Sequence, residues 1–139
     1  MQAFFTALYA TLISFFQQQK PAEFGLYKSV VFSLIGWQML GLTLGLAVIF
    51  YYVVYGPPYL GRQNAQKVTW VLFLLFAAGL GAVVAAYGAY ANEAVSAEPV
   101  SRSYRTYFAM ANALVAALWF FLWSLAVKWQ SRNASKTPF

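Results

Sequence analysis

The chain has 139 residues, of which 62% are hydrophobic and only 9% charged, and its formal net charge is +6. That length and composition suit one small integral membrane domain over residues 1–139. Cysteine and histidine are both absent, which removes thiol nucleophiles, the commonest general base and the commonest metal and haem ligands. We therefore expect no enzymatic activity, no metal site and no bound cofactor.

The first element that the sequence predicts is a helix over residues 2–19. Its apolar part, residues 3–16, would be about 21 Å long as a helix, which is short for a hydrocarbon core of about 30 Å. We expect an amphipathic helix that lies in the membrane interface or against the other helices, and a short, tilted fourth span is the alternative. A narrow stripe of small and polar residues recurs every four positions, at Gln2, Thr6, Ala10, Ser14 and Gln18.

Three long segments without a charged residue follow, over residues 29–55, 69–91 and 107–127. A helix rises about 1.5 Å per residue, so each segment can cross a hydrocarbon core of about 30 Å. The sequence therefore predicts an all-α, multi-pass integral membrane protein. Its parts are three transmembrane helices, the N-terminal interfacial helix and a basic tail over residues 128–139.

Tryptophan and tyrosine gather near the ends of the three segments, where amphipathic rings prefer the headgroup level. One predicted belt holds Tyr55, Tyr59, Trp70, Trp123 and Trp129, and the other holds Tyr27, Tyr87, Tyr90, Tyr104 and Tyr107. Lysine and arginine are nearly balanced between the two sides, so they only weakly favour a cytoplasmic 56–68 loop and C-terminus.

Small residues recur at a spacing of four along each predicted span. In lipid no hydrophobic effect drives helices together, so close backbone approach between small residues supplies the packing. These faces either pack the chain's own bundle or dock on a partner subunit, and we expect docking because three helices can use only part of this surface. The residues are Ser33, Gly41 and Gly45, then Ala77, Gly81, Ala85 and Ala89, then Ala109, Ala113 and Ala117.

The polar and aromatic residues inside the spans are poor candidates for proton transfer or for binding a cofactor. We interpret Gln38 and Asn112 as interhelical hydrogen-bonding groups. No residue within the spans ionises near neutral pH, which argues against a proton-coupled transporter. An aromatic group could stack on a pigment or quinone, but lipid-facing rings explain it equally well, so we expect no specific cofactor and identify no small-molecule substrate. The group is Trp37, Trp119, Phe120, Phe121 and Trp123.

Basic residues in the tail, Lys128, Arg132 and Lys136, are spaced four apart. If the last helix continues past the membrane, they share one face and suit anionic lipid headgroups. The other basic residues are scattered rather than clustered, so we expect no nucleic-acid binding.

Together these features favour a non-catalytic accessory or structural subunit of a larger membrane complex, for example in an energy-transducing membrane. Its expected partners are other membrane protein subunits and anionic lipids. Two alternatives stay open. One is a self-assembling small membrane protein, either a holin-like pore or an envelope or filament protein. The other is a component of a transporter or channel.

Overall fold

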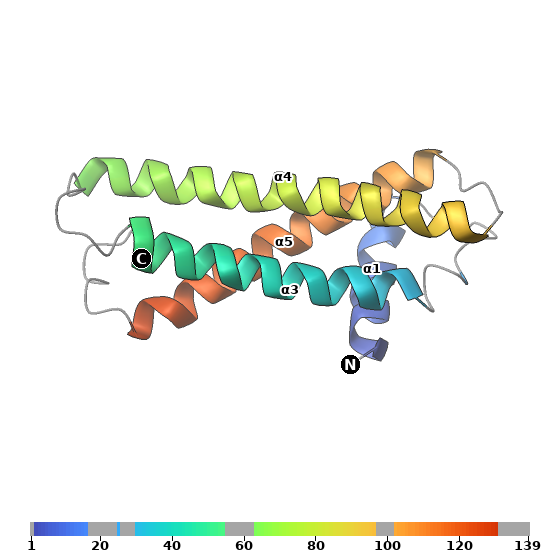
Figure 1. The fold of residues 1–139 in the computed structure, drawn as a ribbon, viewed down its shortest axis with the longest axis horizontal. Coiled ribbons are helices and arrows are strands. Elements are labelled where there is room, and N and C mark those ends of the chain that lie inside the picture. The colour runs from blue at the N-terminus through green and yellow to red at the C-terminus, as the bar shows by residue number, and fades with distance from the viewer. Residues whose placement is uncertain (1, 17–24, 26–29, 55–62, 97–101, 131–139) are drawn as a thin grey trace.

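The structure is a computed structural model that describes residues 2–16, 25, 30–54, 63–96 and 102–130. The elements in this part of the chain are all helices: α1 (Gln2–Phe16), α3 (Phe32–Val48), α4 (Gln63–Ser96) and α5 (Arg102–Gln130). After Val48 the chain continues as a wider π-helical segment, η2 (Ile49–Val54). In Figure 1, α3, α4 and α5 run lengthwise through the molecule, and α1 lies across them near the end where α3 begins.

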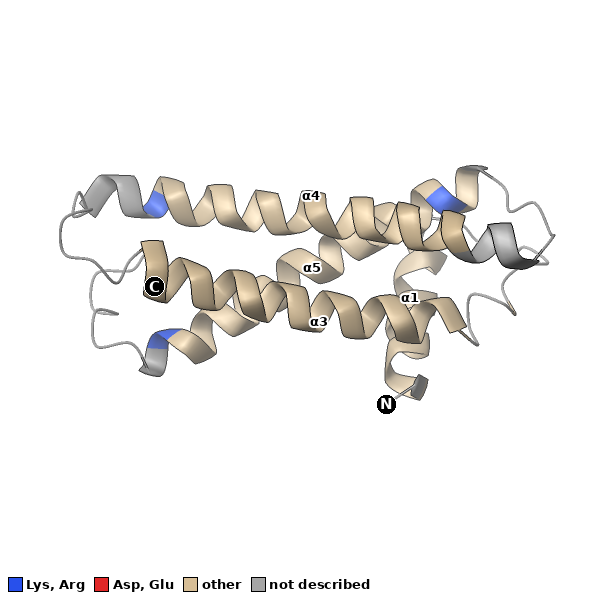
Figure 2. Ribbon diagram, viewed as in Figure 1, with Lys and Arg blue, Asp and Glu red and all other residues tan. Residues whose placement is uncertain are grey.

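Three of these helices are long and apolar enough to cross a membrane. The candidate spans are Phe32–Val54, Lys67–Ala91 and Ser103–Lys128, with 23, 25 and 26 residues. The three predicted transmembrane helices are thereby confirmed, and the chain is a multi-pass membrane protein by length and composition. The described lysine and arginine residues lie near the two ends of the bundle, as Figure 2 shows, where the headgroups of a bilayer would be.

The third span begins earlier than the sequence predicted, at Ser103 instead of residue 107. A charged residue, Arg105, lies in this additional turn, which is why the uncharged segment alone placed the boundary too late. Its guanidinium carbon lies 5.7 Å from the centre of the Tyr90 ring on α4. A cation over an aromatic face is attracted by the ring's quadrupole, so this contact joins the end of α4 to the start of α5.

The most extensive contact in the bundle is between α4 and α5, and the contact of α3 with α5 is more extensive than its contact with α4. Buried side chains form two clusters along this length. The first cluster lies near α1 and includes Phe32, Ile35 and Phe108. The second lies near η2 and includes Phe50 and Phe120.

Helix α1 packs directly against α3 and α5. The buried side chains are those of Phe5, Tyr9 and Ile13, with exposed fractions of 2%, 0% and 4%. The contact face is thus an apolar row, whereas Ser14 of the small and polar stripe is exposed. With 15 residues, α1 is shorter than the three spans, and positions 17–19 of the predicted helix lie outside the described residues.

Two residues assigned to the aromatic belts are instead inside the bundle. Trp70 is 6% exposed and Tyr104 is 1% exposed. The Trp70 Nε1 group donates a hydrogen bond to Ser124 Oγ on α5, at 3.3 Å. A buried indole that has a partner of this kind no longer needs the headgroup level. Tyr87 and Tyr90, by contrast, are 72% and 61% exposed near the opposite end.

Candidate functional site

A buried polar bridge joins three helices near the α1 end of the bundle. Asn112 on α5 is fully buried. Its Nδ2 group donates to the backbone carbonyl of Gly81 on α4 at 2.6 Å. Its Oδ1 atom accepts a hydrogen bond from the Tyr9 hydroxyl of α1. Asn112 therefore forms interhelical hydrogen bonds as predicted, and one side chain fixes the relative positions of α1, α4 and α5.

Tyr9 is the residue of this bridge that sequence reasoning missed. Its ring centre lies 5.4 Å from those of both Phe32 and Phe108. Burial raises the pKa of the Tyr9 phenol above its ordinary value, because the charged phenolate would lose its hydration. The hydroxyl therefore stays a neutral donor to Asn112. The spacing of Phe5, Tyr9 and Ile13 at i, i+4 was the available signal in the sequence.

The small residues of α4 face into the bundle. Ala77, Ala85 and Ala89 are 0–1% exposed, and Gly81 is also buried. A Cβ atom on Gly81 would lie 2.6 Å from Ala116 Cβ and 3.1 Å from the Asn112 carbonyl oxygen of α5. Contact that close requires glycine. The α4 row thus packs against the chain's own α5.

The small residues of α5 lie beside this contact. Ala109, Ala113 and Ala117 are only half-buried. Ala116, which faces Gly81 of α4, belongs to a different row, in which Phe108, Asn112 and Phe120 are also fully buried. A spacing of four was correct for this helix, but several rows of α5 satisfy it, and the sequence did not show which one is buried.

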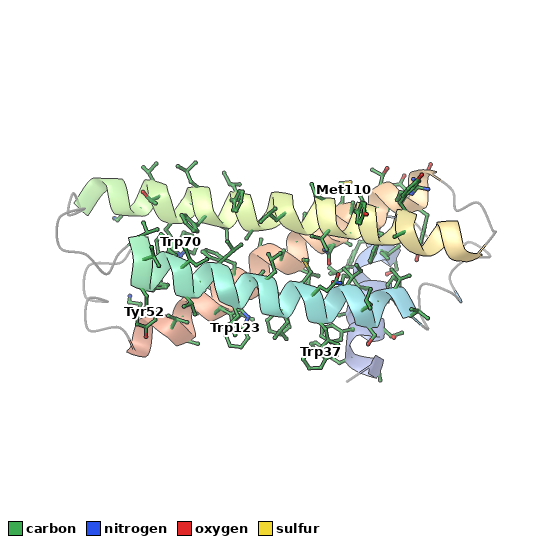
Figure 3. The ribbon with its side chains drawn as sticks, viewed as in Figure 1. Trp37, Tyr52, Trp70, Met110 and Trp123 are labelled. Carbon is green, nitrogen blue, oxygen red and sulfur yellow. The ribbon has the colours of Figure 1, made fainter. Side chains whose placement is uncertain are left out.

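The small residues of α3 are less buried than those of α4. Ser33 is half-buried, whereas Gly41 and Gly45 are exposed, and a Cβ on either glycine would meet nothing within 4 Å. Both glycines belong to an exposed row that repeats at intervals of four, three, four, three and four residues. We call this row the α3 seam: Leu34, Gln38, Gly41, Gly45, Val48 and Tyr52. Tyr52, at one end of the α3 seam, is labelled in Figure 3.

Gln38 is therefore placed differently from Asn112. Its side chain is exposed and lines an open groove of about 630 Å³ between α3 and α4. The groove walls are otherwise largely apolar and include Met39 and Leu42 from α3 and Val84 and Tyr87 from α4. The predicted interhelical role of Gln38 thus has no counterpart within the described bundle.

The aromatic group does not surround one cavity. Phe120 lies 6.1 Å, centre to centre, from Trp70 inside the second cluster. Trp37 packs edge-on against Phe5 at 5.7 Å, and Trp119 stacks on Trp123 at 6.5 Å. Figure 3 shows Trp37 and Trp123 directed away from α4, while Trp70 points from α4 toward the other helices. The remaining member, Phe121, also packs on Trp70.

Of the three basic residues assigned to lipid headgroups, Lys128 is half-buried near the end of α5. Arg132 and Lys136 lie outside the described residues. Among the residues that the structure describes, no three His, Cys, Asp or Glu side chains gather as metal ligands would. No family model, curated protein or solved structure matches the chain.

Proposed function

We propose that this chain is a non-catalytic structural subunit of a membrane complex, which it joins through the α3 seam. The observation that supports this proposal is an exposed row with two glycines and an amide at membrane depth. A glycine inside a helix costs about 1 kcal/mol relative to alanine, which close helix contact can offset. Gly41 and Gly45 have no such contact within the bundle.

The outer rows of the other two spans differ from the α3 seam in composition. The row on α5 consists of large apolar residues that are 37–54% exposed: Met110, Leu114, Leu118, Leu122 and Leu125. On α4, Leu72 and Leu75 are 58% and 61% exposed, and a single glycine, Gly79, follows them. Such rows suit lipid chains. The α3 seam is better suited to another helix, because small residues let two backbones approach.

Charge and composition support the rest of the proposal. The absence of histidine and cysteine leaves few groups for acid–base or nucleophilic catalysis. Lys67 lies near the start of α4 and Lys128 in the last turn of α5, and Figure 1 shows these two helix ends on the same side of the bundle. Basic residues at this level attract anionic lipid headgroups by about 1 kcal/mol each, which would help to hold the subunit at a fixed depth.

The test is the native mass of the protein after gentle detergent extraction from its source membrane. We expect the parent chain to migrate in an assembly that contains at least one other protein. Gly41→Leu should leave this assembly and Gly79→Leu should stay in it, since both glycines are exposed and open but only Gly41 lies in the α3 seam.

Three other results would count against the proposal. A parent chain that migrates as a monomer would refute docking. An assembly built from this chain alone would favour the self-assembling alternative. Equal behaviour of the two leucine variants would show that the α3 seam is not the docking surface.

A further inference from the structure

We propose that the groove between α3 and α4 binds a neutral lipid whose small head group carries a hydroxyl or carbonyl oxygen, as in a diacylglycerol or a quinone. This inference goes beyond the proposed function, because it concerns a lipid and not a protein partner. The groove borders the α3 seam and shares Leu34 and Gln38 with it, but neither Gly41 nor Gly45 lines the groove. The two surfaces can therefore be tested separately.

The groove lies between two helices whose mutual contact is limited, because α3 contacts α5 more extensively than it contacts α4. The two helices touch at Gly88, where a Cβ atom would lie 2.5 Å from Ile35 Cδ1. Beside this contact they leave an open space of about 630 Å³, which is lined by the fully buried Met39 and by Leu42 and Val84. A space of this volume with largely apolar walls is typical of sites for small apolar ligands.

Two hydrogen-bonding side chains lie in these apolar walls, one from each helix. Gln38 comes six residues after Phe32, where the first span begins, and Tyr87 comes four residues before Ala91, where the second span ends. Figure 1 shows these two helix ends on the same side of the bundle. At about 1.5 Å per residue, the two positions are about 9 Å and about 6 Å inside the spans. The groove thus offers an amide and a phenol at similar depths.

The amide of Gln38 indicates that a plain acyl chain does not suffice as the occupant. Its side chain has no hydrogen-bonding partner in the part of the chain that the structure describes, and hydrocarbon chains offer none. A polar group at this depth is costly without a partner. An amide both donates and accepts, so a hydroxyl or a carbonyl oxygen at the same level can bond to it.

The charge of the groove indicates that the head group is neutral. None of the described residues that line the groove carries a charge at neutral pH. A phosphate at the level of Gln38 would lose its hydration without meeting a counter-charge, so a phospholipid keeps its phosphate at the membrane surface. A neutral head group can reach Gln38 while its apolar chain covers Met39 and Leu42.

The test measures which lipid the purified full-length chain retains. The protein in detergent is mixed with equal molar amounts of dioleoylglycerol, decylubiquinone and dioleoylphosphatidylcholine and is passed through a gel-filtration column. Lipid that elutes with the protein is quantified per chain by mass spectrometry. We expect a neutral lipid in about fivefold excess over phosphatidylcholine, the effect of one hydrogen bond. Retention of dioleoylglycerol alone would identify a hydroxyl head group, and retention of decylubiquinone alone a carbonyl head group. Retention of both would identify the oxygen that they share.

Two groove variants and two controls test the site itself. Gln38→Leu removes the amide and should lower retention of the neutral lipid about fivefold. Ala91→Trp adds a large side chain to the groove wall and should lower it at least as much. Gly79→Trp is the matched control, because Gly79 is exposed like Ala91 but does not line the groove. Gly41→Leu, which tests the α3 seam, should also retain lipid like the parent chain. Circular dichroism should give the same helical content for all four variants.

Equal retention of phosphatidylcholine and the neutral lipids would show that the groove holds ordinary membrane lipid and would overturn the inference. An absence of retained lipid would overturn it too, as would a Gln38→Leu variant that retains as much neutral lipid as the parent chain. None of these results would affect the proposed function, which depends on the release of Gly41→Leu from the native assembly. If Gly41→Leu stays in that assembly and the parent chain retains neutral lipid, docking at the α3 seam is refuted and the lipid site stands.

Discussion

Two rows of small residues with the same spacing occupy opposite environments in this molecule. On α4, Ala77, Gly81 and Ala85 are buried against α5. On α3, Gly41 and Gly45 face outward and contact no other helix of the described chain. The chain itself completes the close approach at Gly81 with Ala116, whereas the same kind of approach at Gly41 would require another molecule. Small residues at a spacing of four thus indicate where another helix can pack closely, but not which helix packs there.

The largest expected effect on folding comes from Gly81→Leu. Even a Cβ atom at this position would lie 2.6 Å from Ala116 Cβ, so a leucine must separate α4 from α5. Overpacking of this kind should lower the free energy of unfolding by about 3 kcal/mol. Helical content followed during titration with sodium dodecyl sulfate measures it. Leu72→Ala is the control, because this position is 58% exposed. It should change the free energy of unfolding by less than about 0.5 kcal/mol. Equal stability of the two variants would contradict the buried α4 row.

The second largest loss of unfolding free energy should come from disrupting the polar bridge beside Gly81. Asn112→Ala removes two interhelical hydrogen bonds and should cost about 1–2 kcal/mol. Tyr9→Phe removes only one of them and should cost less. Because the two residues share a bond, the double variant should cost less than the sum of the single ones. The same detergent titration measures all four proteins, and strict additivity would show that Tyr9 and Asn112 do not interact.

High pH should loosen the same bridge. Burial raises the pKa of Tyr9 in the folded state, so its contribution to stability is complete below the ordinary tyrosine pKa of about 10. This contribution is lost as pH rises from about 10 through the raised pKa, by about 1 kcal/mol at pH 11. The measurement is the free energy of unfolding of the parent chain and of Tyr9→Phe at pH 8 and pH 11. The parent chain should lose more stability than the variant, and equal losses would refute the role of Tyr9.

Gly41→Leu should have the smallest effect on the fold, and it completes the comparison with Gly81. Nothing lies within 4 Å of a Cβ at this position, so the unfolding free energy of the monomer in detergent should change by less than about 0.5 kcal/mol. The loss of unfolding free energy would then be much larger for Gly81→Leu on α4 than for Gly41→Leu on α3. A loss similar to that of Gly81→Leu would show that Gly41 packs inside the chain.

The sequence by itself determined that lipid surrounds the long helices of this protein, and how many of these helices there are. The length of an uncharged segment can be read along one dimension, and the run from Ser29 to Tyr55 needs no knowledge of its neighbours. Asn112 was also predictable as an interhelical group, because a polar side chain in an apolar span needs a partner. The short apolar run of residues 3–16 likewise distinguishes α1 from the three spans, because its length can be counted along the chain.

Only the tertiary structure decided which faces are inside. In water, a polar face tells the outside of a helix from its inside, but in lipid both sides are apolar and this signal is lost. The sequence therefore did not separate the buried row of Phe108, Ala116 and Phe120 from the half-buried row of Ala109, Ala113 and Ala117. The burial of Trp70 and the meeting of Tyr9 with Asn112 depend on contacts between residues 54 and 103 positions apart. Such contacts are set by how three helices and α1 pack together, which no local pattern in the chain encodes.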